Sequence, residues 1–125
     1  MITAASAACA NFSAMARFSL RDLEKRVAVR AKASATASYT RALLDKGVAH
    51  CGKKLREEAG ETAAAAVDES RKRVIAESAD LIYHLLVVLK ARGIKLADVE
   101  AELGRRTAQS GHAEKASRRK RRTGK

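Results

Sequence analysis

The chain has 125 residues, no proline or tryptophan, and a formal net charge of +12. This length allows one domain and excludes a barrel enzyme or a doubly wound nucleotide fold with a second domain. Alanine accounts for 27 of the 58 hydrophobic residues, which leaves few large apolar side chains for a core. Because a monomer with so thin a core gains little stability, we expect an oligomer. The charge predicts an anionic partner: nucleic acid, anionic lipid or a phosphorylated metabolite.

The positive charge is concentrated near the C-terminal end. Residues 115–125 hold seven basic residues and no acidic one, and the rest of the chain carries only +5. With nothing larger than alanine to bury, residues 113–125 are expected to form a basic disordered tail, either solubilising or in weak contact with anions. A basic nucleic-acid-binding protein stays open as an alternative function. An aromatic content of 3% argues against it, because bases would find few side chains to stack on.

The N-terminal residues and the cysteines indicate where the protein works. Residues 1–14 carry no basic residue, unlike a secretory signal, so we expect residues 1–17 to be a disordered extension, or Met15 to be the translational start. Cys9 and Cys51 have neither metal-ligand spacing nor a disulfide framework, which favours a reduced, cytoplasmic setting. The longest apolar stretch, residues 81–89, is too short to span a membrane, and no membrane partner is expected.

Alanine abundance and the lack of proline predict an all-α fold. Ser19, with an acidic residue three positions later, predicts a capped helix that begins at Leu20 and ends near Ala33. Ser38 predicts a short helix over residues 39–46, which the following glycine ends.

Two long helices are predicted next, over residues 48–67 and 71–92, followed by a short one over residues 96–106. Ser70 caps the second long helix and Gly93 ends it. Its stretch 81–89 is apolar nearly all round, which predicts burial on several sides. We therefore expect a homodimer with this helix near the interface; a central helix in a monomeric bundle is the alternative.

Acidic side chains recur one helical turn apart in both long helices. Like charges at this spacing repel each other unless a cation binds between them. An antiparallel hairpin that turns at residues 68–70 would bring the two groups to one level, and such oxygen ligands suit Mg²⁺ or Mn²⁺ better than zinc. Solvated acidic helix faces are the alternative. The candidate metal ligands are Glu57, Glu58, Glu61, Glu77 and Asp80.

Basic residues precede the acidic ones along the chain. Lys46, Lys53 and Lys54 are candidates for binding substrate phosphates, although Lys54 could instead pair with Glu57 or Glu58. Carboxylates, a metal and cations together describe a site that cleaves a phosphoanhydride, with a free carboxylate as proton acceptor. The candidate catalytic residues are Glu57, Glu58 and Glu61. His84 is less favoured as a base, and we expect it to be packed or interfacial.

Three stretches of sequence together resemble the phosphoribosyl-ATP pyrophosphohydrolase family. They are the run from Ser38-Tyr39-Thr40 to Glu61, the segment Glu77-Ser78-Ala79-Asp80-Leu81-Ile82-Tyr83-His84-Leu85-Leu86, and the region from Arg105 to Arg118. The resemblance covers residues 18–119, and it carries the family's acidic motif onto the five carboxylates named above. Two positions depart from the family pattern: Arg56 replaces a usual glycine, and Gly60 replaces a usual β-branched residue.

This resemblance implies a dimer with the all-α nucleotide pyrophosphohydrolase fold, formed by residues 18–112. It also implies hydrolysis of the ATP-derived nucleotide 1-(5-phosphoribosyl)-ATP to 1-(5-phosphoribosyl)-AMP and pyrophosphate with Mg²⁺, the second step of histidine biosynthesis. A house-cleaning (d)NTP pyrophosphohydrolase of the same superfamily is the alternative. The chain lacks the residues of the cyclohydrolase to which some relatives are fused, so we expect one activity.

Overall fold

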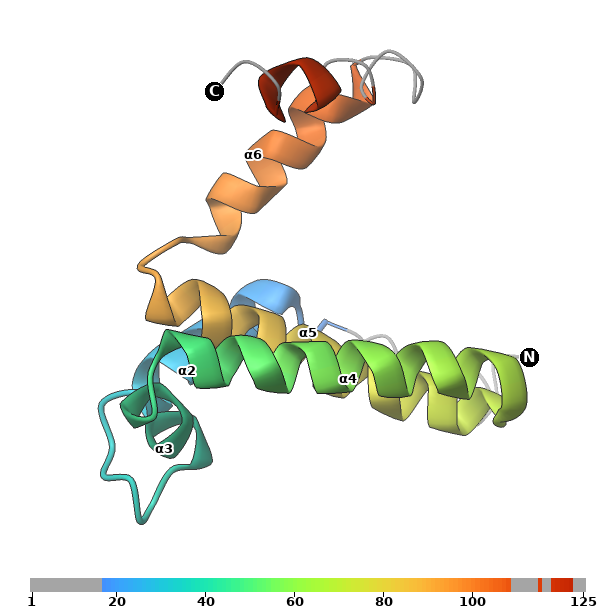
Figure 1. Cartoon of the computed structure of the whole chain (residues 1–125). Coiled ribbons are helices and arrows are strands. Elements are labelled where there is room, and N and C mark those ends of the chain that lie inside the picture. The colour runs from blue at the N-terminus through green and yellow to red at the C-terminus, as the bar shows by residue number, and fades with distance from the viewer. Residues whose placement is uncertain (1–16, 109–114, 116–117, 123–125) are drawn as a thin grey trace, which may run out of the picture. The chain divides into compact units, whose positions relative to one another are not determined.

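The computed structural model describes residues 17–108, 115 and 118–122. All regular structure in these residues is helical, which confirms the predicted all-α class (Figure 1). The expectations for Met15, for the N-terminal extension before Arg17 and for Cys9 lie outside the described residues. The helices, in chain order, are α2 (Leu20–Arg30), α3 (Tyr39–Asp45), α4 (Val48–Asp68), α5 (Arg71–Ala91) and α6 (Leu96–Thr107).

The internal contacts of the chain form two compact units that divide between Gly93 and Ile94, and the expected domain over residues 18–112 spans this division. The first unit holds α2 to α5. The second holds α6 and residues 118–122, whose backbone is helical. Among the described residues, no helix combines the length and the apolar character that crossing a bilayer requires.

Side-chain hydrogen bonds cap both ends of α2. Ser19 Oγ accepts a hydrogen bond from the backbone N–H of Asp22, and Asp22 Oδ2 accepts one from the N–H of Ser19. Helix α2 ends at Arg30, three residues before the predicted end. There the hydroxyl of Ser38 donates to the carbonyl oxygen of Arg30 at 2.9 Å, which satisfies a carbonyl at the helix end.

Two glycines end helices where the backbone must turn. Gly47, between α3 and α4, has a φ of 96°, and Gly93, after α5, has a φ of 67°. A side chain at either position would be strained in this left-handed region, so the predicted helix ends follow from the residue type.

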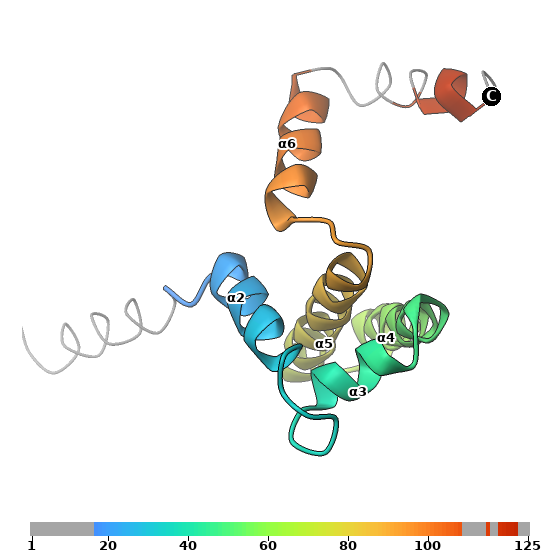
Figure 2. The same ribbon diagram turned by 90° about the vertical axis from the view of Figure 1, so that its left-hand side faces the viewer.

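Helices α4 and α5 form an antiparallel hairpin and lie side by side in both views (Figures 1 and 2). Ser70 caps α5 by accepting from the N–H of Arg73, as predicted. At the other end of the hairpin a small core forms from Leu43, Cys51 and Val87. Val87 is fully buried, which contributes about 1.5–3 kcal/mol for a side chain of this type. This core holds α3 against the hairpin.

Burial along the apolar stretch of α5 is uneven in the single chain. Leu86 and Val87 are buried, whereas Leu85 is 38% exposed and Ile75, six residues before the stretch, is 58% exposed. The expected burial on several sides is therefore not reached within one chain.

Candidate metal centre

Acidic side chains of α4 and α5 meet on the facing sides of the hairpin. Carboxylate oxygens of Glu58, Glu77 and Asp80 lie within 4.8 Å of one another. Glu58 lies seven residues from both Cys51 and Ala65, which are buried, so it shares their face of α4 and points toward α5. The structure thus brings together three of the five predicted ligands at one level.

Two of these carboxylates are largely removed from water. Glu77 is 4% exposed and the side chain of Glu58 is 14% exposed, whereas Asp80 lies at the exposed edge. The Oε2 atoms of Glu58 and Glu77 are buried and have no hydrogen-bond partner among the described residues. A buried oxygen without a partner destabilises the folded chain, so the cluster has unused capacity to bind a cation.

Glu61 joins the cluster through Glu77. The Glu61 carboxyl group is near enough to that of Glu77 to affect its pKa. Burial is the main cause that raises the pKa of Glu77. The neighbouring carboxyl groups of Glu61 and Asp80 raise it further, while Arg73 lowers it. Arg73 Nη2 lies 2.6 Å from Glu77 Oε1.

Thr62 fixes the two helices at the level of the cluster. Its hydroxyl donates to the carbonyl oxygen of Glu58 at 2.8 Å and to that of Glu77 at 3.0 Å. One side chain of α4 therefore bonds to the backbone of α5 next to the acidic groups, which sets the register of the hairpin there.

Glu57 lies apart from the other carboxylates. It is exposed, and its Oε2 accepts a hydrogen bond from Lys54 Nζ at 3.2 Å. That hydrogen bond and the charge of Lys54 lower the pKa of Glu57. One residue corresponds to about 100° of helix rotation, so Glu57 cannot share the inward face of Glu58. Of the two pairings predicted for Lys54, the structure contains the one with Glu57.

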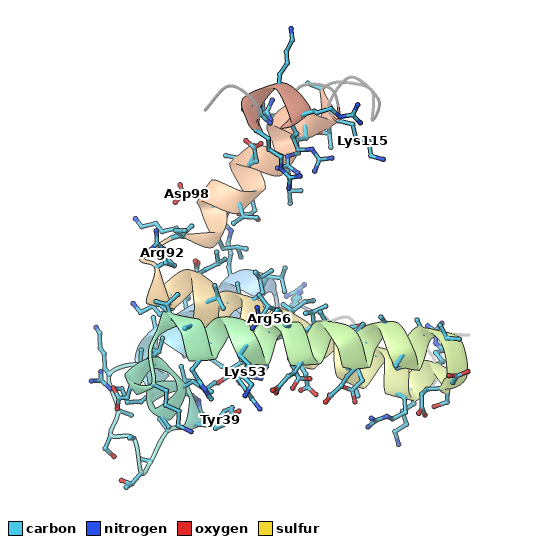
Figure 3. The ribbon with its side chains drawn as sticks, in the orientation of Figure 1. Tyr39, Lys53, Arg56, Arg92, Asp98 and Lys115 are labelled. Atoms are coloured by element: carbon cyan, nitrogen blue, oxygen red, sulfur yellow. The ribbon has the colours of Figure 1, made fainter. Side chains whose placement is uncertain are left out.

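The other predicted phosphate-binding cations are on the surface. Lys46, which caps the end of α3, and Lys53 on α4 are exposed, and Lys54 is half-buried. Figure 3 shows the Lys53 side chain extending from α4 toward its lower edge. All three precede the acidic residues along the chain, so the N-terminal part of α4 is basic where its middle is acidic.

His84 lies beside the cluster in a buried position. It is 5% exposed, and its Nε2 lies 3.9 Å from Glu58 Oε1. Burial lowers the pKa of His84, as does the charge of Lys54, against the opposite effects of Asp80 and Glu57. The ring is packed, as predicted.

Two residues of the site were missed in the sequence: Arg73 and Thr62. Each had a signal in helical spacing. Arg73 lies four residues before Glu77, and Thr62 lies four residues after Glu58.

These side chains suit a hard divalent cation. They offer carboxylate oxygens, they repel each other without a cation, and two of their buried oxygens lack any other partner. Mg²⁺ keeps several of its waters and binds through a few carboxylates together with substrate phosphates, so a site with one open, exposed edge fits it. Fold and site together define an all-α protein whose helical hairpin carries an acidic centre suited to metal-assisted phosphate chemistry.

Comparison with known proteins identifies the family. The profile described as phosphoribosyl-ATP pyrophosphohydrolase matches residues 20–107, and the chain belongs to this family. It is 62% identical over 102 residues to the phosphoribosyl-ATP pyrophosphatase of Azorhizobium caulinodans, covering 82% of this chain and 94% of that protein. It is 60% identical over 104 residues to phosphoribosyl-ATP pyrophosphatase 1 of Bradyrhizobium diazoefficiens, covering 83% and 98%. The phosphoribosyl-ATP pyrophosphatase of Rhizobium meliloti is 53% identical over 104 residues, covering 83% and 97%.

Proposed function

We propose that this chain hydrolyses 1-(5-phosphoribosyl)-ATP to 1-(5-phosphoribosyl)-AMP and pyrophosphate in histidine biosynthesis, with Mg²⁺ as cofactor. Its family and the names of its relatives support the reaction. In the structure, the observation that carries the proposal is the meeting of Glu58, Glu77 and Asp80, with buried oxygens that lack partners.

Mg²⁺ would be held by Glu58, Glu61, Glu77 and Asp80, with Glu57 at the rim. When bound, the metal supplies a Lewis acid for the phosphoryl oxygens and lowers the pKa of a water molecule. Buried Glu58 and Glu77 need a cation most, because they have the least access to water. Asp80 reaches the same level from the exposed edge, where a substrate can enter.

The remaining roles fall to side chains around the cluster. Lys46, Lys53 and Lys54 neutralise phosphate oxygens, and Glu57 orients Lys54 through their 3.2 Å hydrogen bond. Glu61 accepts the proton of the attacking water. It is exposed, so it can meet that water, and its carboxyl group is near the metal-binding groups through its interaction with Glu77.

The working form that we propose is a cytoplasmic homodimer in which a second copy covers α5. Ile75 and Leu85 are exposed in the single chain, and burying large apolar side chains like these favours association. Sedimentation of the wild-type protein and of Leu85→Glu tests this, with a dimer expected for the first and a shift toward monomer for the second.

A direct assay separates this function from its alternative. Purified protein with Mg²⁺ should release pyrophosphate from 1-(5-phosphoribosyl)-ATP, with 1-(5-phosphoribosyl)-AMP as the other product by mass spectrometry. Faster hydrolysis of ordinary dNTPs under the same conditions would favour the house-cleaning enzyme. Nucleic acid enters the proposal only as a weak contact of the basic tail, and deleting residues 115–125 should leave hydrolysis unchanged.

A further inference from the structure

Tyr39, the first residue of α3, is an exposed aromatic residue with no role in the site described above. It is 57% exposed. Its ring stacks on that of Tyr83 with the centroids 6.4 Å apart and the planes 20° from parallel. The ring of His84 meets it edge-on, with the centroids 6.3 Å apart and the planes at 88°. Tyr39, Tyr83 and His84 thus form an aromatic cluster with one open member.

A hydrogen bond between Thr40 and Tyr83 holds the aromatic cluster in place. A 2.6 Å hydrogen bond joins Thr40 Oγ1 to the hydroxyl of Tyr83 across 43 positions of sequence, and Thr40 is only 1% exposed. Thr40, the next residue in the chain, and Tyr83, on which Tyr39 stacks, are both held in place by this bond. Tyr39 therefore has little conformational freedom left to lose when a ligand binds. Such preordering raises affinity without additional contacts.

The cluster borders the carboxylates. His84 packs against Tyr39 on one side, and its Nε2 lies 3.9 Å from Glu58 on the other. Lys54 interacts electrostatically with Glu57, Tyr39 and Glu58, so it lies near both the aromatic cluster and the acidic groups. Figure 3 shows Tyr39 and Lys53 extending toward the same edge of α4. An open aromatic ring therefore stands beside the place proposed for the phosphates.

The chemistry of the substrate makes such a ring useful. In 1-(5-phosphoribosyl)-ATP the second ribose is attached to N1 of the purine, so the edge that normally forms base-pair hydrogen bonds is occupied. The flat face of the base remains for recognition, and aromatic side chains bind that face. The other described aromatic side chains are less suited: Tyr83 is half-buried beneath Tyr39, and the ring of Phe18 has the guanidinium of Arg26 4.8 Å from its centroid.

We propose that Tyr39 is a substrate-binding residue that stacks on the purine ring of the nucleotide while its phosphates bind at the carboxylate cluster. This inference deepens the proposed function and rests on it. Stacking on the base is remote from the bond that breaks, so it stabilises the bound substrate and the transition state equally and acts on KM rather than kcat.

Substitutions at Tyr39 give the first test. Tyr39→Ala should raise KM about tenfold with kcat changed less than about twofold, a size typical of one lost base–aromatic contact. Tyr39→Phe keeps the ring and should leave both constants near the wild type. Tyr39→Leu keeps an apolar side chain without the ring and should behave like the alanine variant. Unchanged KM in Tyr39→Ala, or an equal loss in Tyr39→Phe, would overturn the proposal.

A binding measurement separates this inference from the reaction itself. The chain has two tyrosines, so ¹³C-tyrosine NMR gives few signals, and those missing in Tyr39→Phe belong to Tyr39. Adding 1-(5-phosphoribosyl)-AMP should shift the Tyr39 signals upfield through the ring current of the base, while pyrophosphate alone should not. If the wild type releases no pyrophosphate from its substrate, the proposed function fails, yet this shift still tests Tyr39. Absence of the shift at saturating product, or a Tyr39→Ala variant that only dissociates the dimer, would contradict stacking.

Discussion

Glu77 on α5 and Glu102 on α6 are both glutamates that contact arginine, but their surroundings differ in one decisive respect. Glu102 accepts hydrogen bonds from Arg105 at 2.7 and 3.0 Å and from Arg106 at 3.1 Å, and its side chain is 42% exposed. These bonds hold its pKa at about 2. Glu77 contacts Arg73 through one oxygen, while its other oxygen is buried without a partner.

A carboxylate in a structural ion pair and one in a binding site thus differ in whether their own neighbours balance the charge. Arg105 and Arg106 balance the charge of Glu102, so this carboxylate needs no additional cation. Glu77 faces other carboxyl groups, and its pKa is raised by burial and by those groups. A site that would gain from an additional positive charge is where a divalent cation binds.

The largest expected effect comes from removing charge at the cluster. Glu77→Gln, Asp80→Asn and Glu58→Gln should each lower kcat/KM by about 100-fold or more, because an amide cannot replace an anionic ligand of the metal. Glu102→Gln, the matched control, should stay within about twofold of the wild type. Steady-state pyrophosphate release measures this, with circular dichroism to verify folding. Equal losses at Glu77 and Glu102 would remove the distinction between them.

The second-largest effect is expected when the metal is removed, because the folded protein then loses the stability that Mg²⁺ binding adds. A ligand at 100 times its dissociation constant adds about 2.7 kcal/mol, which for a domain of this size raises the melting temperature by roughly 10 °C. Wild type and Glu102→Gln should therefore both melt higher in excess Mg²⁺ than in EDTA, and Glu77→Gln should respond much less. A Glu77→Gln variant that gains as much as the wild type would place the Mg²⁺ elsewhere.

The two glutamates should also give opposite pH dependences in the metal-free protein. The pKa of Glu77 is raised above 4.5, so the folded state binds more protons between 4.5 and that higher pKa, and stability falls as pH rises through this window. The pKa of Glu102 is lowered from 4.5 to about 2, so its contribution is complete above 4.5 and is lost as pH falls toward 2.

Urea unfolding in EDTA across these pH values measures both slopes. Glu77→Gln should lose the decline above pH 4.5, and Glu102→Gln should lose part of the decline toward pH 2. The Glu102 effect should be the smaller one, because solvent screens this exposed pair. Slopes of the same sign at both positions would contradict the contrast.

The smallest expected effect concerns single arginines around Glu102. Arg105→Gln should change stability only slightly, because Arg106 still contacts Glu102 and exposed ion pairs contribute little. Turnover should not change. Thermal unfolding beside Glu102→Gln measures this, and a loss of stability as large as that caused by a core substitution would show that Glu102 has a structural role beyond its surface pairs.

Helix ends were predictable because local chemistry sets them. Ser38 and Ser70 cap α3 and α5, and Gly47 and Gly93 adopt the positive φ that ends a helix. All these signals act within a few residues, so no knowledge of the fold was required. The end of α2 was placed too late because its cap comes from Ser38, eight residues after Arg30.

The sequence predicted that acidic groups of α4 and α5 meet, but it predicted less well which of them face each other. Turn position alone placed the acidic groups of α4 and α5 at one level. The choice between Glu57 and Glu58 depended on which face of α4 is buried, and the spacing of Cys51, Glu58 and Ala65 contained that information. The bond between Thr40 and Tyr83 joins distant parts of the chain, and no local pattern indicates it.

We propose that the carboxylate cluster between α4 and α5 binds the divalent cation used in hydrolysis. Titration of EDTA-treated protein with Mn²⁺, followed by electron paramagnetic resonance of the free ion, tests it most directly. We predict saturable binding in wild type and Glu102→Gln, with affinity at least about tenfold weaker in Glu77→Gln. Unchanged Mn²⁺ affinity in a folded Glu77→Gln protein would contradict the claim.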